Sequence, residues 1–519
     1  MTSSGFFRSA KYFLAIIWGC WWSNLPAQDN GTTKIELLNA DVSEFDENFN
    51  AGATRLLGNV RLRHESALMS CDSAYLYRDD NRLEAFGRIR IDQGDSMTLT
   101  GGKLNYDGNT RVADVFDRIV LTDGKMTLRT RKIAYNLSNS TATYTDSANI
   151  VDGENTLTSR TGFYYSRSKD LYFKKEVLLK NPKYTLTCDT LRYNTGSRTA
   201  FFVGPTDIVT DKSKMYCENG WYNTVRQNST FIGRSYLISG TQVLQGDSIQ
   251  YDQKVSIGKA YRHVSLTDTS RKMIIRGDYA EHHASTDSSW VTKSAEMVQY
   301  DERDSLFLHA DTLLAIGKRV TNDSLSRDVM AFHHVKIYKS DLQGACDSLT
   351  YSQSDSTIRF FRNPILWSGV NQMTADSITL HTNGGALSKI ILKNNAFLVS
   401  QADTTQKGPV DSLRFNQITG KIMTGLFVEN EIDRIEVKGN GQTIYYARNK
   451  KNRDVAVNRA DCSDLLIRIK GNEVRKITLM NDPDGTLYPI KALSLSELRL
   501  KGFNWQSDRR PTSRLSIFN

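Results

Sequence analysis

A carboxylate recurs at one place in a short repeated phrase, and it is the residue type in this sequence best suited to chemistry. Each phrase contains a small residue, the acid, usually Ser or Thr, and a closing tyrosine, as in Cys71-Asp72-Ser73 and Cys188-Asp189-Thr190. Acid–base catalysis by carboxylates needs two of them beside one substrate. These acids are spread along the chain, one in each copy, so they predict a structural role and not a catalytic pair.

The cysteines do not form a metal-binding pattern. There is no CxxC and no zinc spacing among the five that follow Cys20, which are Cys71, Cys188, Cys217, Cys346 and Cys462. Cys71, Cys188 and Cys346 immediately precede the acid of a phrase, where other copies carry Gly or Ala, which favours small, buried, apolar side chains. Cys188 and Cys217 occupy matching positions of adjacent copies, so a disulfide between them in an oxidising compartment stays open.

The histidines and the known catalytic motifs give no enzyme prediction either. The pairs His282-His283 and His333-His334 are adjacent in sequence, and adjacent residues on a strand point to opposite faces, which disfavours a shared metal ion. The chain has no phosphate-binding loop, nucleophile elbow, HExxH or dinucleotide fingerprint. We therefore expect no enzymatic activity, no metal and no cofactor.

The phrase is repeated at a nearly constant period. Its closing tyrosines follow one another in steps of 28 to 30 residues, at Tyr77, Tyr106, Tyr135, Tyr165, Tyr193, Tyr222 and Tyr251. Less regular copies follow at Gly277-Asp278, Ala310-Asp311, Cys346-Asp347, Ala375-Asp376 and Val410-Asp411. A steady period of this length indicates stacked supersecondary units, each burying its neighbours.

Each unit has the chemistry of β-strands. The phrases and the runs between them are rich in β-branched and aromatic residues and are bounded by Gly, Asn, Asp and Ser. In the fifth copy Leu186 and Cys188 share one parity, whereas Leu191 and Tyr193 have the other. Because strand side chains alternate, this predicts a bulge or corner at the acid of each phrase. The carboxylate would lie outside and accept bonds from freed backbone N–H groups.

The two ends differ in composition from the repeats. Residues 1–27 predict a secretory signal peptide cleaved after Ala27, and a lipoprotein signal with Cys20 acylated is the alternative. Between the ends we expect a first β-jellyroll over 28–280, an irregular connection over 281–340 and a second jellyroll over 341–480. A basic tail over 481–519 completes the chain.

The charge favours an anionic lipid over a nucleic acid as partner. The chain carries +10, and the residues from Arg499 onward hold five basic side chains against Asp508. In an exported protein such a field suits phosphorylated glycolipid headgroups. A solvated surface with a frayed basic end is the alternative.

The sequence resembles the OstA-like (organic solvent tolerance) family over about residues 30–450. Gly58–Leu62 followed by Cys71-Asp72-Ser73 and Tyr77 carries the likeness, and Gly246-Asp247-Ser248 with Tyr251 repeats it. The resemblance implies an all-β fold, an elongated antiparallel β-jellyroll opened like a folded taco. It also implies a periplasmic bridge for lipopolysaccharide transport to the outer membrane, whose apolar interior shelters acyl chains. Association with the inner face of that membrane is part of the same expectation.

The expected lipid-facing residues are apolar members of the phrases. The candidates are Leu76, Leu104, Ile133, Phe163, Leu191, Trp221 and Ile249. Ordinary core packing is the alternative for each of them. Open strand edges would pair with other jellyroll transport proteins or form a homo-oligomer. A structural β-solenoid or adhesin with a closed core and a carbohydrate-active β-helix enzyme stay open as other functions.

Overall fold

The computed structural model describes most of the chain after the expected signal peptide. The described residues are 33–45, 52–93, 97–124, 126–300, 304–321, 324–383, 386–403, 405, 408–429, 431–449, 454–471, 473–490, 492–494 and 496–519. The predicted cleavage after Ala27 and the alternative lipidation of Cys20 lie outside them. The chain divides into two compact units, one ending at Phe116 and including Asn136–Ser138, the other made of Asp117–Tyr135 and Asn139–Asn519.

The first unit is built from short edge strands and long hairpin strands. They are β1 (Glu36–Asn39), β2 (Val42–Phe45), β3 (Thr54–His64), β4 (Ala67–Tyr77), β5 (Arg82–Gln93), β6 (Met97–Asp107) and the start of β7 (Val112–Asp123). β3, β4, β5 and β6 pair antiparallel in chain order. Inward residues of these strands, such as Leu56 and Leu62, are completely buried.

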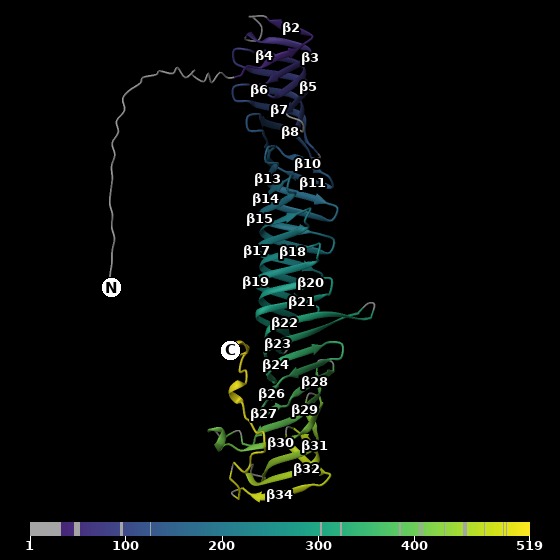
Figure 1. Ribbon diagram of the computed structural model, residues 1–519, viewed down its shortest axis with the longest axis vertical. Helices are drawn as coiled ribbons and strands as arrows, with labels where there is room; N and C mark the ends of the chain where they lie inside the picture. The colour runs from purple at the N-terminus through teal and green to yellow at the C-terminus, as the bar shows by residue number, and fades with distance from the viewer. Residues whose placement is uncertain are drawn as a thin grey trace, which may run out of the picture. The chain divides into compact units, whose positions relative to one another are not determined.

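The second unit continues the same pattern over many more strands (Figure 1). They are β8 (Met126–Asn136), β9 (Thr141–Tyr144), β10 (Ala148–Asp152), β11 (Asn155–Ser159), β12 (Thr161–Tyr165), β13 (Asp170–Asn181), β14 (Tyr184–Asn194), β15 (Thr199–Val209), β16 (Ser213–Asn223), β17 (Asn228–Ser239), β18 (Gln242–Asp252), β19 (Ile257–Asp268), β20 (Met273–His283), β21 (Ser288–Tyr300), β22 (Ser305–Thr321), β23 (Ser324–Tyr338), β24 (Gln343–Ser352), β25 (Thr357–Phe361), β26 (Ile365–Ser368), β27 (Asn371–Thr374), β28 (Ser377–Asn383), β29 (Ala386–Gln401), β30 (Phe415–Val428), β31 (Glu431–Arg448), β32 (Asp454–Lys470), β33 (Glu473–Met480) and β34 (Asp484–Pro489). Short 3-10 helices stand at η2 (Val410–Ser412), η3 (Ser507–Arg509) and η4 (Leu515–Phe518).

Every described pairing in both units is antiparallel, which confirms the all-β jellyroll-like class. The strands from β20 to β23, whose described residues include most of 281–340, pair with their neighbours. The irregular connection expected over this range stays a prediction. The expected series of two jellyrolls, over 28–280 and 341–480, stays a prediction.

The predicted corner at the acid of each phrase is confirmed by the strand register. The pairing of β14 with β15 slips between Cys188 and Thr190, and that of β18 with β19 slips between Gln245 and Ser248. On β19 the second slip falls on two residues with left-handed backbone, Arg262 (φ 56°) and His263 (φ 48°). The extra residues restore the inward parity of the apolar side chains on both sides of the corner.

The partner of the acid differs from the expected one. In most described corners the carboxylate accepts from a side chain of the facing corner, as Asp72 does from Arg88 Nε at 2.7 Å. A backbone donor of the expected kind occurs at Asp464, which accepts from the Gly439 N–H at 3.1 Å. Left-handed corner residues project their side chains across the corner, so a long polar side chain reaches the carboxylate first.

The same geometry explains one histidine pair. His333 and His334 are the two left-handed residues of a corner, with φ of 62° and 50°. Their Nδ1 atoms lie 3.2 Å from Asp347 Oδ1 and 2.9 Å from Asp311 Oδ2, so the two rings serve different acids. The pair is a corner element and not a chelating site.

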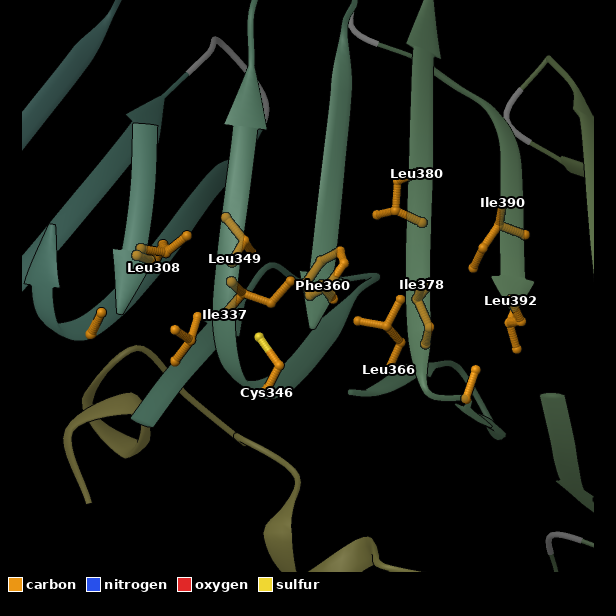
Figure 2. Close-up of a cluster of buried hydrophobic side chains, with 14 of the residues drawn as sticks. Leu308, Ile337, Cys346, Leu349, Phe360, Leu366, Ile378, Leu380, Ile390 and Leu392 are labelled. Carbon is orange, nitrogen blue, oxygen red and sulfur yellow. The ribbon is translucent and has the colours of Figure 1, made fainter. Parts of the chain in front are cut away.

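Inward side chains form a continuous apolar core in the second unit. This core extends from Met273 to Ile467 and includes residues of β20 to β32. Figure 2 shows part of it, with Ile337, Leu349, Phe360 and Ile378 from successive strands gathered along the interior. Stacking therefore gives each strand its buried neighbours, as the repeat predicts.

The C-terminal segment adds a second apolar layer on the outer face of this sheet. Leu498 and Leu500 pack with Phe415, Tyr446 and further residues in a core separate from the interior. From there the chain runs back along the strands toward β23, as the yellow trace of Figure 1 shows. Trp367, on the outer face under this segment, has no exposed surface.

The basic side chains of this segment bond to the protein itself. Arg499 donates to the Leu413 carbonyl at 2.6 Å, Arg510 to Gln343 Oε1 at 2.8 Å, and Arg514 to Glu296 at 2.7 Å. The interpretation of a frayed, solvated basic end is therefore wrong for these three arginines. Long-range contacts that no local pattern encodes hold them in place.

Candidate functional site

One column of inward residues lies in register across neighbouring strands of the second unit. Column A consists of Leu191, Phe202, Gly220, Phe231, Ile249 and Ala260, each directly opposite the next. A Cβ on Gly220 would lie 2.5 Å from the Thr230 carbonyl oxygen. Because Gly220 has no side chain, Phe202 and Phe231 stack across it, with ring centroids 6.4 Å apart. Column A is thus a close-packed wall of the interior.

A second column lies on the other side of the corner. Column B consists of Leu186, Ile208, Met215, Leu237, Leu244, Leu266, Ile275 and Met297, again paired one to the next. The two ends of this column are buried, with Leu186 at 2% and Met297 at 4% exposure. The five residues from Ile208 to Leu266 are only half-buried. We call these five residues the half-open stripe.

The half-open stripe is a place where apolar side chains remain within reach of solvent although they face inward. Its members come from β15 to β19, so at the usual strand spacing it extends over about 19 Å. In the first unit the corresponding residues Leu62, Met69, Ile91 and Leu99 are at most 3% exposed. The accessible interior is therefore a local property of β15 to β19 among these strands.

Five of the seven predicted groove residues point inward. Leu76, Leu104, Ile133, Leu191 and Ile249 are buried. Phe163 and Trp221 are half-buried instead. In those two copies a glycine, Gly162 or Gly220, takes a buried position on the strand, so the neighbouring aromatic residue has the opposite parity.

The two aromatic residues that face outward join a row of similar side chains. Phe163 pairs with Tyr172, and Trp221 pairs with Phe201. Arg192 lies between the two pairs, its guanidinium 5.7 Å from the Tyr172 ring centroid and 5.2 Å from that of Phe201. Cross-strand aromatic and cation–π contacts of this kind stabilise the outer face of the sheet.

The half-open stripe was missed by the sequence interpretation. Two of its members, Met215 and Leu244, open their phrases, and the same place holds Leu99, Leu128 and Leu186 in other copies. This regular apolar position is the signal in the sequence that indicates the stripe. The predicted groove residues lie one or two positions before the closing tyrosine instead, on the other side of the corner.

The thiols of this region are not reactive groups. Cys188 and Cys217 are free and buried, and Thr206 on β15 lies between them. Burial raises the pKa of both thiols to about 12. Two strand spacings exceed the reach of a disulfide, so the bridge left open by the sequence is not formed.

The described residues contain no group of three or more His, Cys, Asp or Glu side chains placed to hold a metal ion. Nor does the described chain contain a helix long and apolar enough to cross a membrane.

Two strands, β2 and β34, have exposed edges. β2 pairs with β3 and all four of its residues are exposed. In the described chain β34 pairs with β32 alone, and Leu487 on it is 63% exposed. Edges of this kind can accept a strand from another chain.

The first part of the chain matches a known protein family. Residues 32–189 and 175–247 match the family described as OstA-like protein. This part of the chain is similar to the OstA-like family. The OstA-like part contains Leu191 and most of the half-open stripe, and the antiparallel pairing continues beyond it to β34.

No curated protein matches the chain. One solved structure that is similar is that of LptH, the LptA-homologous periplasmic component of the lipopolysaccharide transport device of Pseudomonas aeruginosa. The two chains are 14% identical in sequence, and the match has a TM-score of 0.21. It covers 22% of the present chain and 93% of the LptH chain.

Proposed function

We propose that this protein is a periplasmic bridge that carries lipopolysaccharide or a related glycolipid toward the outer membrane. The observation that carries the proposal is the half-open stripe within an OstA-like fold, because it presents inward apolar side chains that solvent, and hence an acyl chain, can reach. The protein acts by binding and not by catalysis.

The energetics suit a trough better than a pocket. Exposing an acyl chain to water costs about 0.8 kcal/mol for each CH₂. A row of apolar side chains in register removes that cost at each position along it. Cargo that slides needs no specific, deep pocket.

Partner jellyrolls would extend this trough by strand pairing. The exposed edges of β2 and β34 are the surfaces we propose for such partners or for a second copy of the chain. Pairing would continue the hydrogen-bond ladder across the junction.

A closed structural solenoid is the second candidate. It is favoured by the buried interior after Ile275, where Met297 of column B and Leu308, its partner on β22, have 4% exposure or less. In that case the half-open stripe would be no more than loosely covered core.

Photo-crosslinking in cells separates the two functions. A crosslinker at Leu244, in the half-open stripe, is expected to capture glycolipid. One at Gln245, the next residue on the same strand and on the opposite face, is the matched control and is expected to capture none. Equal capture at both positions, or none at Leu244, would favour the solenoid.

A further inference from the structure

The repeating strand pattern of the second unit is interrupted at the corner between β9 and β10, as it is again between β25 and β26. Most phrases run through their corner as one strand, but here the chain is divided into β9 and β10 and, on the partner, into β11 and β12. Ser147 donates its N–H to the Arg160 carbonyl at 2.9 Å, and Arg160 donates its own to the Lys175 carbonyl at 3.1 Å. The interrupted corner opens a cleft of about 620 Å³.

Most of the residues that line the cleft have polar or charged side chains, and several of them are hydrogen-bond donors. Arg129, Asn149 and Thr158 lie in register on β8, β10 and β11, so their side chains are on one face at neighbouring strand positions. Arg131 and Arg160 also line the cleft. A guanidinium, an amide and a hydroxyl are thus placed side by side, with two further guanidiniums at the corner.

Two of the three arginines have no carboxylate partner within the described residues. Arg160 Nε lies 2.8 Å from Glu176 Oε2, which neutralises it. Arg129 and Arg131 are exposed and form no ion pair with any described residue. Asp146 is the other acid of the lining, so the cleft has three cations against two anions, with both free cations on β8.

We infer that this cleft binds a phosphate group. Guanidinium groups bind phosphate oxygens with two parallel hydrogen bonds, and Asn and Thr donors supply the remaining ones. The cleft is open to solvent, and no aromatic residue is among those that line it.

A phosphorylated glycolipid headgroup and free phosphate offer the same chemistry to this site. The phosphate site stands on the cleft alone, whereas the lipid as the source of the phosphate rests on the proposed function. The two sources are distinguished by comparing ligands that share the phosphate but differ in the lipid.

The test uses the full mature chain and a charge-matched control. The variant Arg129→Gln/Arg131→Gln removes the two free cations of the cleft. The control Arg226→Gln/Lys254→Gln removes two exposed cations of other hairpins. Calorimetry is carried out with inorganic phosphate, with a short-chain phosphorylated glycolipid and with the same glycolipid after dephosphorylation. Displacement of a fluorescent fatty acid reports separately on the interior.

We expect wild type and control to bind the phosphorylated glycolipid about tenfold more tightly than the dephosphorylated one, and the cleft variant to lose this difference. Inorganic phosphate binding that the cleft variant loses, without a preference between the lipids, supports the site with free phosphate as its ligand. Equal phosphate binding by all three proteins overturns the inference. Failure of every protein to bind the fatty acid would overturn the proposed function and leave the phosphate site standing.

Discussion

Arg514 donates two hydrogen bonds of 2.7 Å to Glu296, a residue 218 positions earlier in the chain. Glu296 is only 2% exposed and also accepts from Arg276 at 2.9 Å. The carboxylate therefore joins the C-terminal segment to the outer face of β20 and β21. A buried acid with two arginine partners is stable only while both remain in place.

Removing Arg514 should release the end of this segment. Arg514→Ala leaves a buried carboxylate with one partner, and since the Arg514 side chain is itself 45% exposed, we expect a loss of about 2 kcal/mol. Hydrogen exchange of residues 507–519 should then quicken about 30-fold. Arg509→Ala is the control, because Arg509 contacts Gln506 within the same segment. Equal exchange in both variants would contradict the role of the ion pair.

Acid should release the same segment. Burial raises the pKa of the Glu296 carboxyl, but the bonds from Arg514 and Arg276 outweigh it and hold that pKa below its ordinary value. A carboxyl whose pKa is lowered by folding stabilises the folded state at pH values above its unfolded pKa of about 4.3. This stability is lost as the pH falls through its folded pKa. Limited proteolysis of the C-terminal segment from pH 7 to pH 3 should show release only at the acid end. In Glu296→Gln this pH dependence should vanish.

A corner glycine should resist substitution more than a hairpin glycine. Gly233 has φ 79°, and a Cβ there would lie 2.6 Å from Glu218 Oε2. Gly240 in the next turn has φ 56° and open space around a Cβ. Both alanine variants carry the left-handed backbone cost of about 1–2 kcal/mol, but Gly233→Ala adds the clash. Urea unfolding should show Gly233→Ala to be the less stable protein, and the reverse order would refute the corner geometry.

Trp367 should matter far more than the other outward tryptophan already described. Trp367 is fully buried beneath the C-terminal segment, and its Nε1 donates to Gln372 at 3.3 Å. Trp367→Ala should cost about 3–5 kcal/mol, as a large cavity does. Trp221 is half-buried, and Trp221→Ala should cost clearly less. The two are compared by hydrogen exchange of the strands on either side.

The thiols should be unreactive in the folded protein. Burial raises the pKa of Cys188 and Cys217 to about 12, so little thiolate exists at neutral pH. Iodoacetamide should label neither until the protein is denatured, after which both should react. Rapid labelling of the native protein, or a mass two hydrogens lower than that of the free thiols, would refute the described packing.

Much of the architecture follows from the sequence. The period of the tyrosines indicates stacked units, and the change of parity between Cys188 and Leu191 predicts the corner that the register slip confirms. Both depend on the alternation of strand side chains, which is a local property. The inward position of Leu191 and Ile249 follows from the same rule.

Other features depend on contacts that no local pattern encodes. Phe163 and Trp221 face outward because glycine takes the inward place in their copies, so the parity within one phrase does not transfer to the next. The half-open stripe arises from how far neighbouring strands cover one another. The course of the C-terminal segment depends on Glu296 meeting Arg514 across 218 residues, and such a meeting exists only after the strands have stacked. The alternation of side chains along a strand is determined by the local sequence, whereas the burial of each strand face depends on what packs against it in the folded protein.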